Sequence, residues 1–375
     1  MMLHSISVAV LLVFAAAPAA PDVFANAGPV PVVKVKVDKA NLDQLLKEPR
    51  KYVTATLEVG TETWKSVGLH MKGAAGSTRD WSDKPGLTLN SNKFSKGQTI
   101  WGMDKFHFNN CVQDGTYLNE TIFYDISRDV GLPAARTTHA LVELNGRKAG
   151  LYLLKEGFDA AFLKRHFKDT TGNLYDGGFL LDIDGGIRLD RGPGPAGDDL
   201  KLLVAAAQIP DAKKRMAALD QKLDLEKFYL LWALEILTTD WDGYTRTRNN
   251  YRMYHDPKSD KFVMFPHGKD QLFQNPQDGL VHGWNGILAR KIYETDEGKK
   301  KYHAVLNELA KKYFTTAKLH ERADALAPRV KDALNALQPG AGDQYMKGEF
   351  KAYKDRLKQR AEYVAREAPK LISPR

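Results

Sequence analysis

The sequence predicts an α+β fold with two lobes, the first rich in sheet and the second rich in helix. Over about the first 155 residues, short runs alternate apolar with polar side chains, which is the pattern of half-buried strands. From about residue 200 onward, apolar residues recur instead at the spacing of helices. Strands followed by helices favour an α+β layout. We therefore expect one bilobal domain, with an N-lobe over residues 28–155 and a C-lobe over residues 156–375.

The N-lobe begins with a predicted strand, a short helix and a hairpin. Residues 31–38 alternate valine with lysine or aspartate, and a short helical stretch follows them. Residues 51–73 alternate apolar and polar side chains about a Gly-Thr turn, which is typical of a β-hairpin. Two further strands are predicted within 87–94 and 101–110.

The period then changes for one helix and returns to that of strands. Leu118, Ile122, Ile126 and Val130 recur at helical spacing, and a Gly-x-Pro stop signal follows them. Two apolar runs then flank Asn145-Gly146, a strong hairpin-turn signal. The N-lobe is thus predicted to be an antiparallel sheet interrupted by one helix.

The C-lobe is predicted to be mainly helical, with one hairpin. The Gly- and Asp-rich stretch 175–199 leaves three interpretations open: an ordered loop, a hairpin or a partly mobile insertion. An apolar helix capped by Asp224 is expected to end near Asp240. Residues 249–273 form two strand-like runs joined by a polar turn, and amphipathic helices follow.

Composition and the N-terminus narrow the class of protein. The chain has 375 residues, a net charge of +9 and a single cysteine, so no disulfide can form within it. The basic surface favours anionic partners, but no nucleic-acid-binding motif is present. A short apolar run, followed by small residues and by Ala-Asn-Ala before Gly28, predicts a signal peptide over residues 1–27 and an exported protein, whether secreted, periplasmic or on the cell surface. No later stretch is apolar enough to cross a membrane.

Polar clusters of the N-lobe mark two candidate functional segments. The loop 73–84 is rich in Gly, Ser and Thr, and such a loop can present backbone N–H groups to an anion. An ordinary flexible loop is the simpler interpretation. Glu120 lies near the start of the predicted helix and could fix a lysine of the sheet for phosphate binding. A helix-terminal glutamate stabilised by the helix dipole is the alternative.

Two further clusters lie in the C-lobe. Asp240 and Asp242 follow the long apolar helix, in a loop that ends at Asn249 and Asn250. Phosphoryl transfer needs a carboxylate near the nucleophile and oxygen ligands for magnesium, and this loop supplies both. Asp270 follows the second strand of the hairpin, so Asn250 and Asp270 are expected to face one cavity. Two alternatives to a phosphoryl-transfer site remain for this region: an exposed polar loop, or a hydrolase site with paired carboxylates.

The order of these segments resembles the CotH (spore coat protein H) kinase-like family. The matching stretches lie within about Lys34–Phe273, and the most specific is a helix ending in Gly-Leu-Pro-Ala, a strand, an Asn-Gly turn and then Gly-Leu-Tyr-Leu-Leu-Lys-Glu. The resemblance implies an atypical protein-kinase-like fold. It also implies use of ATP with Mg²⁺ or Mn²⁺ to phosphorylate Ser or Thr of a secreted or surface protein. Other members of the family are known only as secreted or coat-associated proteins.

The resemblance assigns roles to individual residues. Lys84 would meet the α- and β-phosphates with Glu120 as its partner, Ser77 and Thr78 would lie in the phosphate loop, and Glu156 would lie in the hinge near the adenine. Asp242 would be the catalytic acid residue, Asn249 or Asn250 a metal ligand, and Asp270 the metal-binding aspartate.

Departures from the family pattern support an alternative function. Lys72 and Ala74 replace the arginine and asparagine of an Arg-Gly-Asn-Ser loop, and Gly268 stands where the family has an acid. The alternative is a catalytically weak pseudokinase, or a cell-surface or coat-associated binding protein. The sequence does not indicate an oligomeric state.

Overall fold

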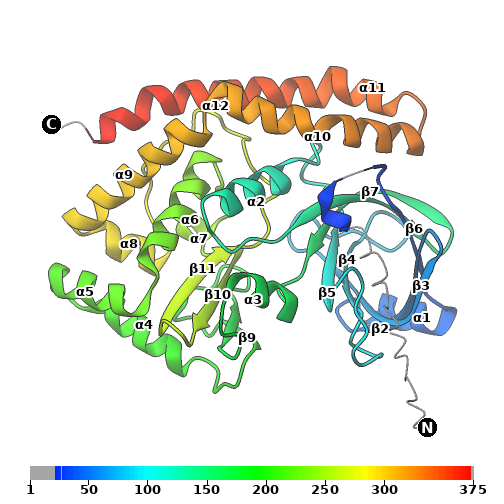
Figure 1. The fold of residues 1–375 in the computed structure, drawn as a ribbon, viewed down its shortest axis with the longest axis horizontal. Coiled ribbons are helices and arrows are strands. Elements are labelled where there is room, and N and C mark those ends of the chain that lie inside the picture. The colour runs from blue at the N-terminus through cyan, green and yellow to red at the C-terminus, as the bar shows by residue number, and fades with distance from the viewer. Residues whose placement is uncertain (1–21, 27, 373–375) are drawn as a thin grey trace, which may run out of the picture.

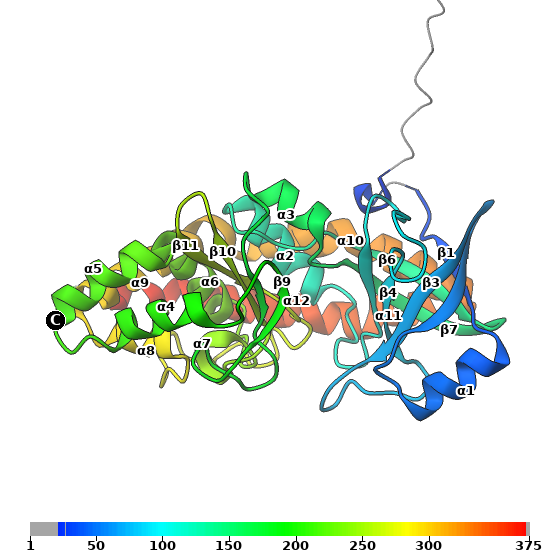
Figure 2. The same cartoon turned by 90° about the horizontal axis from the view of Figure 1, so that it is seen from below.

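The computed structural model describes residues 22–26 and 28–372 and confirms the predicted α+β class. Figure 1 shows a barrel of strands at one end and a mostly helical lobe at the other, with the C-terminal helices running along one side of both. Figure 2 shows the same two parts from below. The barrel and the helical lobe each surround a hydrophobic core of their own.

The strands of the predicted antiparallel N-lobe sheet close into a barrel. The strands are β1 (Val32–Lys36), β2 (Val53–Val59), β3 (Glu62–Lys72), β4 (Gly86–Asn90), β5 (Lys105–Asn109), β6 (Thr137–Leu144) and β7 (Arg147–Glu156). Their order is β1-β2-β3-β4-β5-β7-β6. A parallel pairing of β1 with β6, in which Val33 faces Val142, closes the barrel. Alternating residues such as Val35, Leu57 and Leu69 fill the interior.

Local signals explain most N-lobe elements. Asp38 caps α1 (Lys39–Lys47) by accepting a hydrogen bond from the Asn41 N–H. Asn145 and Gly146 take positive φ angles of 48° and 83°, as a tight turn between β6 and β7 requires. Helix α2 (Asn119–Asp129) lies in sequence between the strands, but its apolar face belongs to the larger core of the helical lobe.

The C-lobe contains a second sheet of four strands in the order β11-β10-β8-β9. These are β8 (Leu174–Asp176), β9 (Arg188–Arg191), β10 (Tyr251–Asp256) and β11 (Lys261–Pro266). The pairing of β8 with β9 shows that the Gly- and Asp-rich stretch contains a hairpin. The helices of this lobe are α3 (Ala160–His166), α4 (Asp198–Gln208), α5 (Ala212–Lys222), α6 (Leu225–Leu237), α7 (Tyr244–Thr247), α8 (Ile287–Tyr293), α9 (Asp296–Tyr313), α10 (Thr316–Leu337), α11 (Ala341–Tyr345) and α12 (Lys351–Glu367).

Helix α6 is the buried centre of the C-lobe and carries the functional loop at its end. Asp224 caps its N-terminus, as predicted, and the helix ends at Leu237. The guanidinium group of Arg360, in α12, donates hydrogen bonds of 2.6 and 3.0 Å to the carbonyls of Ile236 and Leu237. Carbonyl groups in the last turn of a helix have no hydrogen-bond donor within that helix, and these two belong to the last turn of α6. Helix α12 therefore fixes the point from which the loop after α6 departs.

A short N-terminal segment packs on the outside of the barrel. The 3₁₀ turn η1 (Val23–Ala25) places Phe24, only 9% exposed, against the barrel core, and the guanidinium group of Arg136 lies 4.4 Å from its ring. Asn26 accepts a hydrogen bond from Thr138, and Arg329 of α10 donates to the Asn26 carbonyl. Residues 1–21 and 27 of the predicted signal peptide lie outside the described residues, so the signal peptide stays a prediction.

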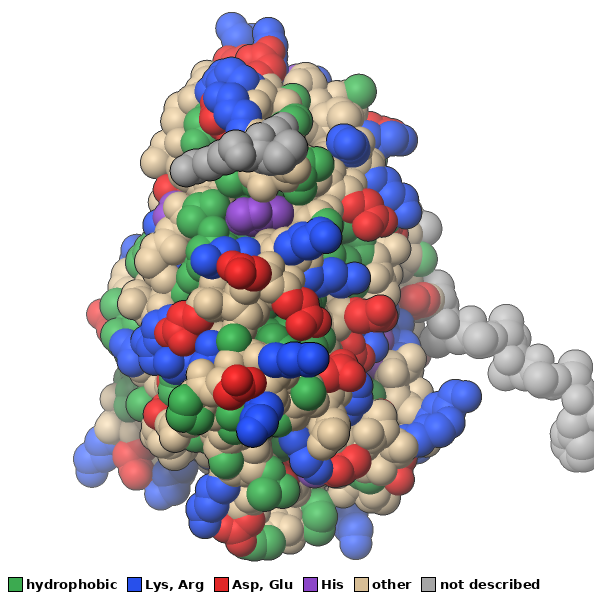
Figure 3. Space-filling model, turned by 90° about the vertical axis from the view of Figure 1, so that its left-hand side faces the viewer, with side chains coloured by type: hydrophobic (Ala, Val, Ile, Leu, Met, Phe, Trp, Pro, Cys, Tyr) green, Lys and Arg blue, Asp and Glu red, His purple; other side chains and the backbone are tan. Residues whose placement is uncertain are grey.

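Within residues 22–26 and 28–372, no helix is both long and apolar enough to span a bilayer. Figure 3 shows Lys and Arg side chains interspersed with Asp and Glu over the left-hand end of the molecule. The positive net charge is thus not gathered into one patch on that face.

Candidate active site

A cavity of about 830 Å³ lies between the barrel and the C-lobe. Strands β3, β4, β5 and β7 form its roof, and the segments around Asp242, Asn250 and Asp270 form its floor. A cleft between two lobes is a common place for a small-molecule site.

The register of the barrel places one row of polar side chains on the roof. His70 pairs with Thr88, Thr88 with His107, and His107 with Lys155, so these four side chains cross the sheet in a line. Residues paired across strands share one face of a sheet. All four line the cavity, and so does Lys72 at the end of β3.

The buried ion pair of the site joins Lys155 to Glu120. The Lys155 Nζ lies 3.2 Å from Glu120 Oε1, and both side chains are buried. Burial opposes ionisation of Glu120, but Lys155 and Lys72 outweigh burial and lower its pKa. Lys72 donates to Asn109, whose amide group in turn donates to Glu120. Burial, reinforced by Lys155, lowers the pKa of Lys72 to about 7.

Lys84 does not lie in this cavity, contrary to the expected pairing with Glu120. Its Nζ lies 5.1 and 5.3 Å from the ring centroids of Tyr117 and Tyr152, and 3.4 Å from the Tyr117 hydroxyl. The side chain also passes over Gly150, where an added Cβ would lie 3.3 Å from Lys84 Cε. Lys84 precedes β4. Alternation within a strand does not determine the direction of a side chain that lies before the strand begins.

Lys155 was missed by the sequence reasoning, although the pattern of β7 contains its signal. Tyr152 and Leu154 fill the barrel core, so alternation sends Lys155 to the opposite face. Residue 156 then points away from the cavity. Glu156 is buried, pairs with Arg136 at 3.2 Å and also pairs with Arg165. The structure therefore places the Glu156 side chain outside the cavity, although its neighbour Lys155 lines it.

The loop after β3 brings Ser77 to the cavity but turns Thr78 aside. The Ser77 hydroxyl accepts a hydrogen bond of 3.0 Å from the Ala74 N–H, and Ser77 lines the cavity. The Thr78 hydroxyl donates to the Ala74 carbonyl at 3.0 Å, within the loop itself. Asn110 donates to the Ser77 carbonyl and fixes the loop against the end of β5.

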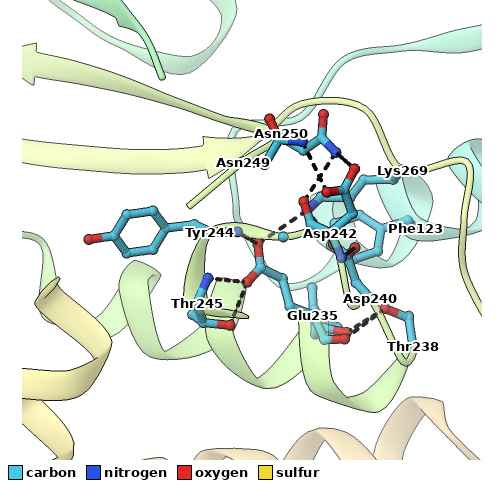
Figure 4. A network of polar contacts seen from close by, with 12 residues as sticks. Phe123, Glu235, Thr238, Asp240, Asp242, Tyr244, Thr245, Asn249, Asn250 and Lys269 are labelled. Carbon is cyan, nitrogen blue, oxygen red and sulfur yellow. Dashed lines mark hydrogen bonds and ion pairs between the residues drawn. The ribbon is translucent and has the colours of Figure 1, made fainter. Parts of the chain in front are cut away.

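On the floor, two amide groups hold the carboxylate of Asp242. The Asn249 Nδ2 donates to Asp242 Oδ1 at 3.0 Å, and the Asn250 Nδ2 donates to Asp242 Oδ2 at 2.8 Å (Figure 4). The His267 N–H donates to the Asn250 carbonyl at 2.8 Å, which extends the β10–β11 pairing. The hairpin thus returns residues 267–270 to the loop that holds Asp242. The structure brings Asp242, Asn249, Asn250 and Asp270 to one cavity.

Gly268 has no space for a side chain in this arrangement. Its φ angle is +46°, and an added Cβ would lie 2.5 Å from Asn250 Oδ1. The amide oxygen of Asn250 therefore lies where a side chain at position 268 would begin. The acid that the family pattern has at this position would displace Asn250.

The oxygen atoms on the floor fit a hard divalent cation only in part. Among the described residues, no group of three or more His, Cys, Asp or Glu side chains could hold a metal ion. Asp270 and Asn250 supply a carboxylate and an amide oxygen, which suit Mg²⁺ or Mn²⁺. Burial, reinforced by Glu120, raises the pKa of Asp270 to about 6. Such a small set of protein ligands suits a metal ion whose other coordination positions are filled by water molecules and nucleotide phosphates.

Comparison with known proteins gives the family of the chain and two kinds of relative. The model of the family described as CotH kinase protein matches residues 69–364. The inner spore coat protein H of Bacillus subtilis (strain 168) is 22% identical over 266 residues, covering 64% of this chain and 71% of that protein. Invasin CotH2 of Rhizopus delemar is 23% identical over 336 residues, covering 79% of this chain and 56% of the invasin. The chain thus spans little more than half the length of that invasin.

Two solved structures are similar at low TM-scores. One is a complex of HipA, HipB and operator DNA from Shewanella oneidensis MR-1, with a TM-score of 0.40, 13% identity, and coverage of 93% of this chain and 76% of that chain. The other is the proinflammatory kinase CtkA of Helicobacter pylori, with a TM-score of 0.34, 10% identity, and coverage of 76% and 94%. The family match includes every segment of the cavity floor, from Asp242 to Asp270. The chain belongs to the CotH kinase protein family.

Proposed function

We propose that this protein is an exported kinase that transfers the γ-phosphate of ATP to Ser or Thr residues of a secreted or surface protein, with Mg²⁺ or Mn²⁺. One observation carries the proposal. The Lys155–Glu120 pair on the roof and the Asp242, Asn250 and Asp270 side chains on the floor meet in one cavity between the lobes. Phosphoryl transfer depends mainly on positioning and on electrostatic stabilisation, and this set of side chains supplies both.

Lys155 is the lysine that we assign to the phosphates, in place of Lys84. Its ammonium group is fixed by Glu120 at 3.2 Å and by the Tyr124 hydroxyl at 3.2 Å. Lys72 lies at the same end of the roof and adds a second amine beside the Ser77 loop. A preorganised cation in a site shielded from water stabilises the charge that develops on a transferring phosphoryl group.

Asp242 is the residue that we assign to the acceptor hydroxyl. Asn249 and Asn250 each donate one hydrogen bond to its carboxylate, which holds the carboxylate in one orientation. Each carboxylate oxygen has a further lone pair with which to accept the proton of a Ser or Thr hydroxyl. Loss of that proton makes the hydroxyl oxygen a stronger nucleophile toward the γ-phosphorus.

Asn250 and Asp270 are the residues that we assign to the metal. The Asn250 Nδ2 bonds Asp242, so its Oδ1 is the atom free for a cation, and it lies beside Gly268. Asn249 also donates its amide group to Asp242, but it is 5% exposed and lies deeper in the floor. A bound divalent cation would neutralise phosphate charge during transfer.

The names of the relatives support the proposal that the substrate lies at a cell surface or coat. Their names refer to a spore coat and to invasion, so a surface or coat-associated substrate is the partner we propose. The predicted signal peptide and the net charge of +9 agree with an acidic partner outside the cell.

A phosphate-transfer assay tests the proposal. Purified protein is incubated with γ-labelled ATP and Mg²⁺ or Mn²⁺, with itself and casein as acceptors, and compared with the Asp242→Asn and Asp270→Asn variants. We expect incorporation to fall at least about 100-fold in both variants. Lys258→Met, on the exposed turn of the same hairpin, is the control.

The alternative function has a distinct signature. A pseudokinase or binding protein would incorporate no label with either metal. If Mg-ATP or Mn-ATP also failed to raise the melting temperature, the cavity would not bind nucleotide, and the proposed function would be wrong.

A further inference from the structure

Lys269 lies next to Asp270 but points away from the cavity. Its side chain is completely buried in the C-lobe, beneath α2. The Nζ lies 2.5 Å from Asp240 Oδ2 and 3.1 Å from Glu235 Oε1 (Figure 4). It also lies 5.2 Å from the ring centroid of Phe123. The ammonium group is thus bound by two carboxylates from the end of α6 and the loop that follows it.

Each of these carboxylates also holds the backbone of the loop that carries Asp242. Asp240 accepts a hydrogen bond of 3.1 Å from the Asp242 N–H. Glu235 accepts hydrogen bonds of 3.0 and 3.1 Å from the N–H groups of Tyr244 and Thr245. The position of residues 242–245 therefore depends on the two acids that Lys269 bridges.

The backbone around Lys269 is tied to α2 on its other side. The Lys269 N–H donates to Glu120 Oε1 at 3.2 Å. The Asn119 Nδ2 donates to the Asp270 carbonyl at 2.8 Å. Residues 269–270 are therefore held between α2, which carries the partner of Lys155, and the loop of Asp242.

The Lys269 ammonium group and the two carboxylates that bind it are all buried. Removing the ammonium group would leave two carboxylates close together in the protein interior. Breaking a buried ion pair by removing one partner is strongly destabilising, because the remaining charge has no compensation.

We propose that Lys269 is a positioning residue that couples Asp270 to the Asp242 loop. Its side chain sets the distance between the two segments, so that the metal-binding and hydroxyl-binding side chains face one point in the cavity. Its effect on phosphate transfer rests on the proposed function, whereas the coupling of the two segments does not.

The principal variant is Lys269→Met, which keeps the length of the side chain and removes the charge. Hydrogen–deuterium exchange of the whole protein is followed in residues 240–250 and 266–273. We expect exchange to become at least about tenfold faster in both segments, because local opening becomes easier. The control is Arg215→Met, which removes a buried cation that pairs with Glu294 far from the cavity. Exchange in the two segments should not change in the control.

A second variant tests whether Lys269 acts by bridging the two segments or only by neutralising the two carboxylates. Lys269→Met with Asp240→Asn restores the net charge of the cluster but not the bridge. We expect this variant to regain part of the melting temperature lost by Lys269→Met while both segments still exchange fast. Slow exchange in both segments of the double variant would show that only charge matters and would overturn the proposal.

Metal affinity gives a further readout. We expect the Mn²⁺ affinity of the ATP complex, measured by electron paramagnetic resonance, to fall at least about tenfold in Lys269→Met and to stay unchanged in Arg215→Met. If the wild-type protein bound neither Mn²⁺ nor ATP, the proposed function would fail, but the exchange experiment would still decide the coupling. Wild-type exchange rates in both segments of Lys269→Met would overturn the coupling.

Discussion

Gly268 shows how one residue changes the interpretation of the site. In the sequence, a glycine in place of an acid favoured a pseudokinase. In the structure, the Asn250 amide oxygen occupies the space that a side chain at position 268 would need, and the backbone φ angle of +46° also favours glycine. The absence of a side chain at position 268 is therefore a condition for the observed position of Asn250.

The first prediction concerns this glycine. Gly268→Asp should displace Asn250, lower phosphate transfer at least tenfold and destabilise the fold by about 1–3 kcal/mol, because of backbone strain and crowding. Urea denaturation and the transfer assay check both effects. Gly283→Asp, where an added Cβ meets nothing within 4 Å, is the matched control. Higher metal affinity in Gly268→Asp would contradict the expected displacement.

The second prediction distinguishes the two candidate phosphate lysines. Lys155→Met should lower kcat by about 100- to 1,000-fold, because it removes the cation that Glu120 directs into the cavity. Lys84→Met should cost far less, since Lys84 packs between Tyr117 and Tyr152 outside the cavity. Steady-state kinetics on both variants check this order, and the reverse order would restore the assignment that the family resemblance implied.

The sequence predicted candidate site residues that share the cavity, but not the lysine on its roof. Glu120, Asp242, Asn250 and Asp270 all line the cavity, because turns and helix ends bring them there. Alternation with Tyr152 and Leu154 indicates the face of β7 on which Lys155 lies, but the sequence does not show that this face covers the cavity. The roles of these residues stay predictions.

At the scale of elements, a histidine links the C-lobe sheet to α4. His255 of β10 binds Asp199 of α4 at 3.0 Å and Asp260 of the hairpin turn at 2.9 Å, and it stacks on Phe262. Lys222 of α5 also binds Asp260, so positive charge reaches this aspartate from two elements. The hydrogen bond to Asp199 is the main cause that raises the pKa of His255, against the effect of burial.

The third prediction is a pH dependence from this link. Because the pKa of His255 is higher in the folded state than its ordinary value of 6.5, its stabilisation is fully present below about pH 6.5. The stabilisation is lost as the pH rises through the folded-state pKa. The melting temperature of His255→Gln should therefore fall below that of the wild type most at about pH 5.5 and least at about pH 8.5. A larger difference at the higher pH would contradict the assignment.

At the scale of the whole molecule, most N-lobe strands and the mainly helical C-lobe could be predicted, but α3, the β8–β9 pairing and the closure of the barrel could not. The hairpins β2–β3 and β6–β7 carry local turn signals, so their existence was evident. The parallel pairing of β1 with β6 joins residues more than a hundred positions apart, such as Val33 and Val142, and no local pattern specifies it.

The docked N-terminal segment has a consequence for how the chain is processed. Cleavage after Ala27, as the sequence predicts, would remove Phe24 from its place against the barrel and would take a carbonyl partner from Arg329. A protease that cut there would uncover an apolar surface on the finished protein. If the proposed export includes cleavage, we predict that the cut falls upstream of Asp22, so that Asp22–Asn26 are retained.

The fourth prediction follows from this retained segment. A chain beginning at Gly28 should melt at a lower temperature than one beginning at Asp22, because burial of one phenylalanine side chain contributes about 1.5–3 kcal/mol. Intact-mass measurement of the exported protein identifies its first residue, and calorimetry compares the two chains. Phe24→Ala in the longer chain should reproduce most of the difference. A mature protein that starts at Gly28 and melts at the same temperature would show that Phe24 is not needed once export is complete.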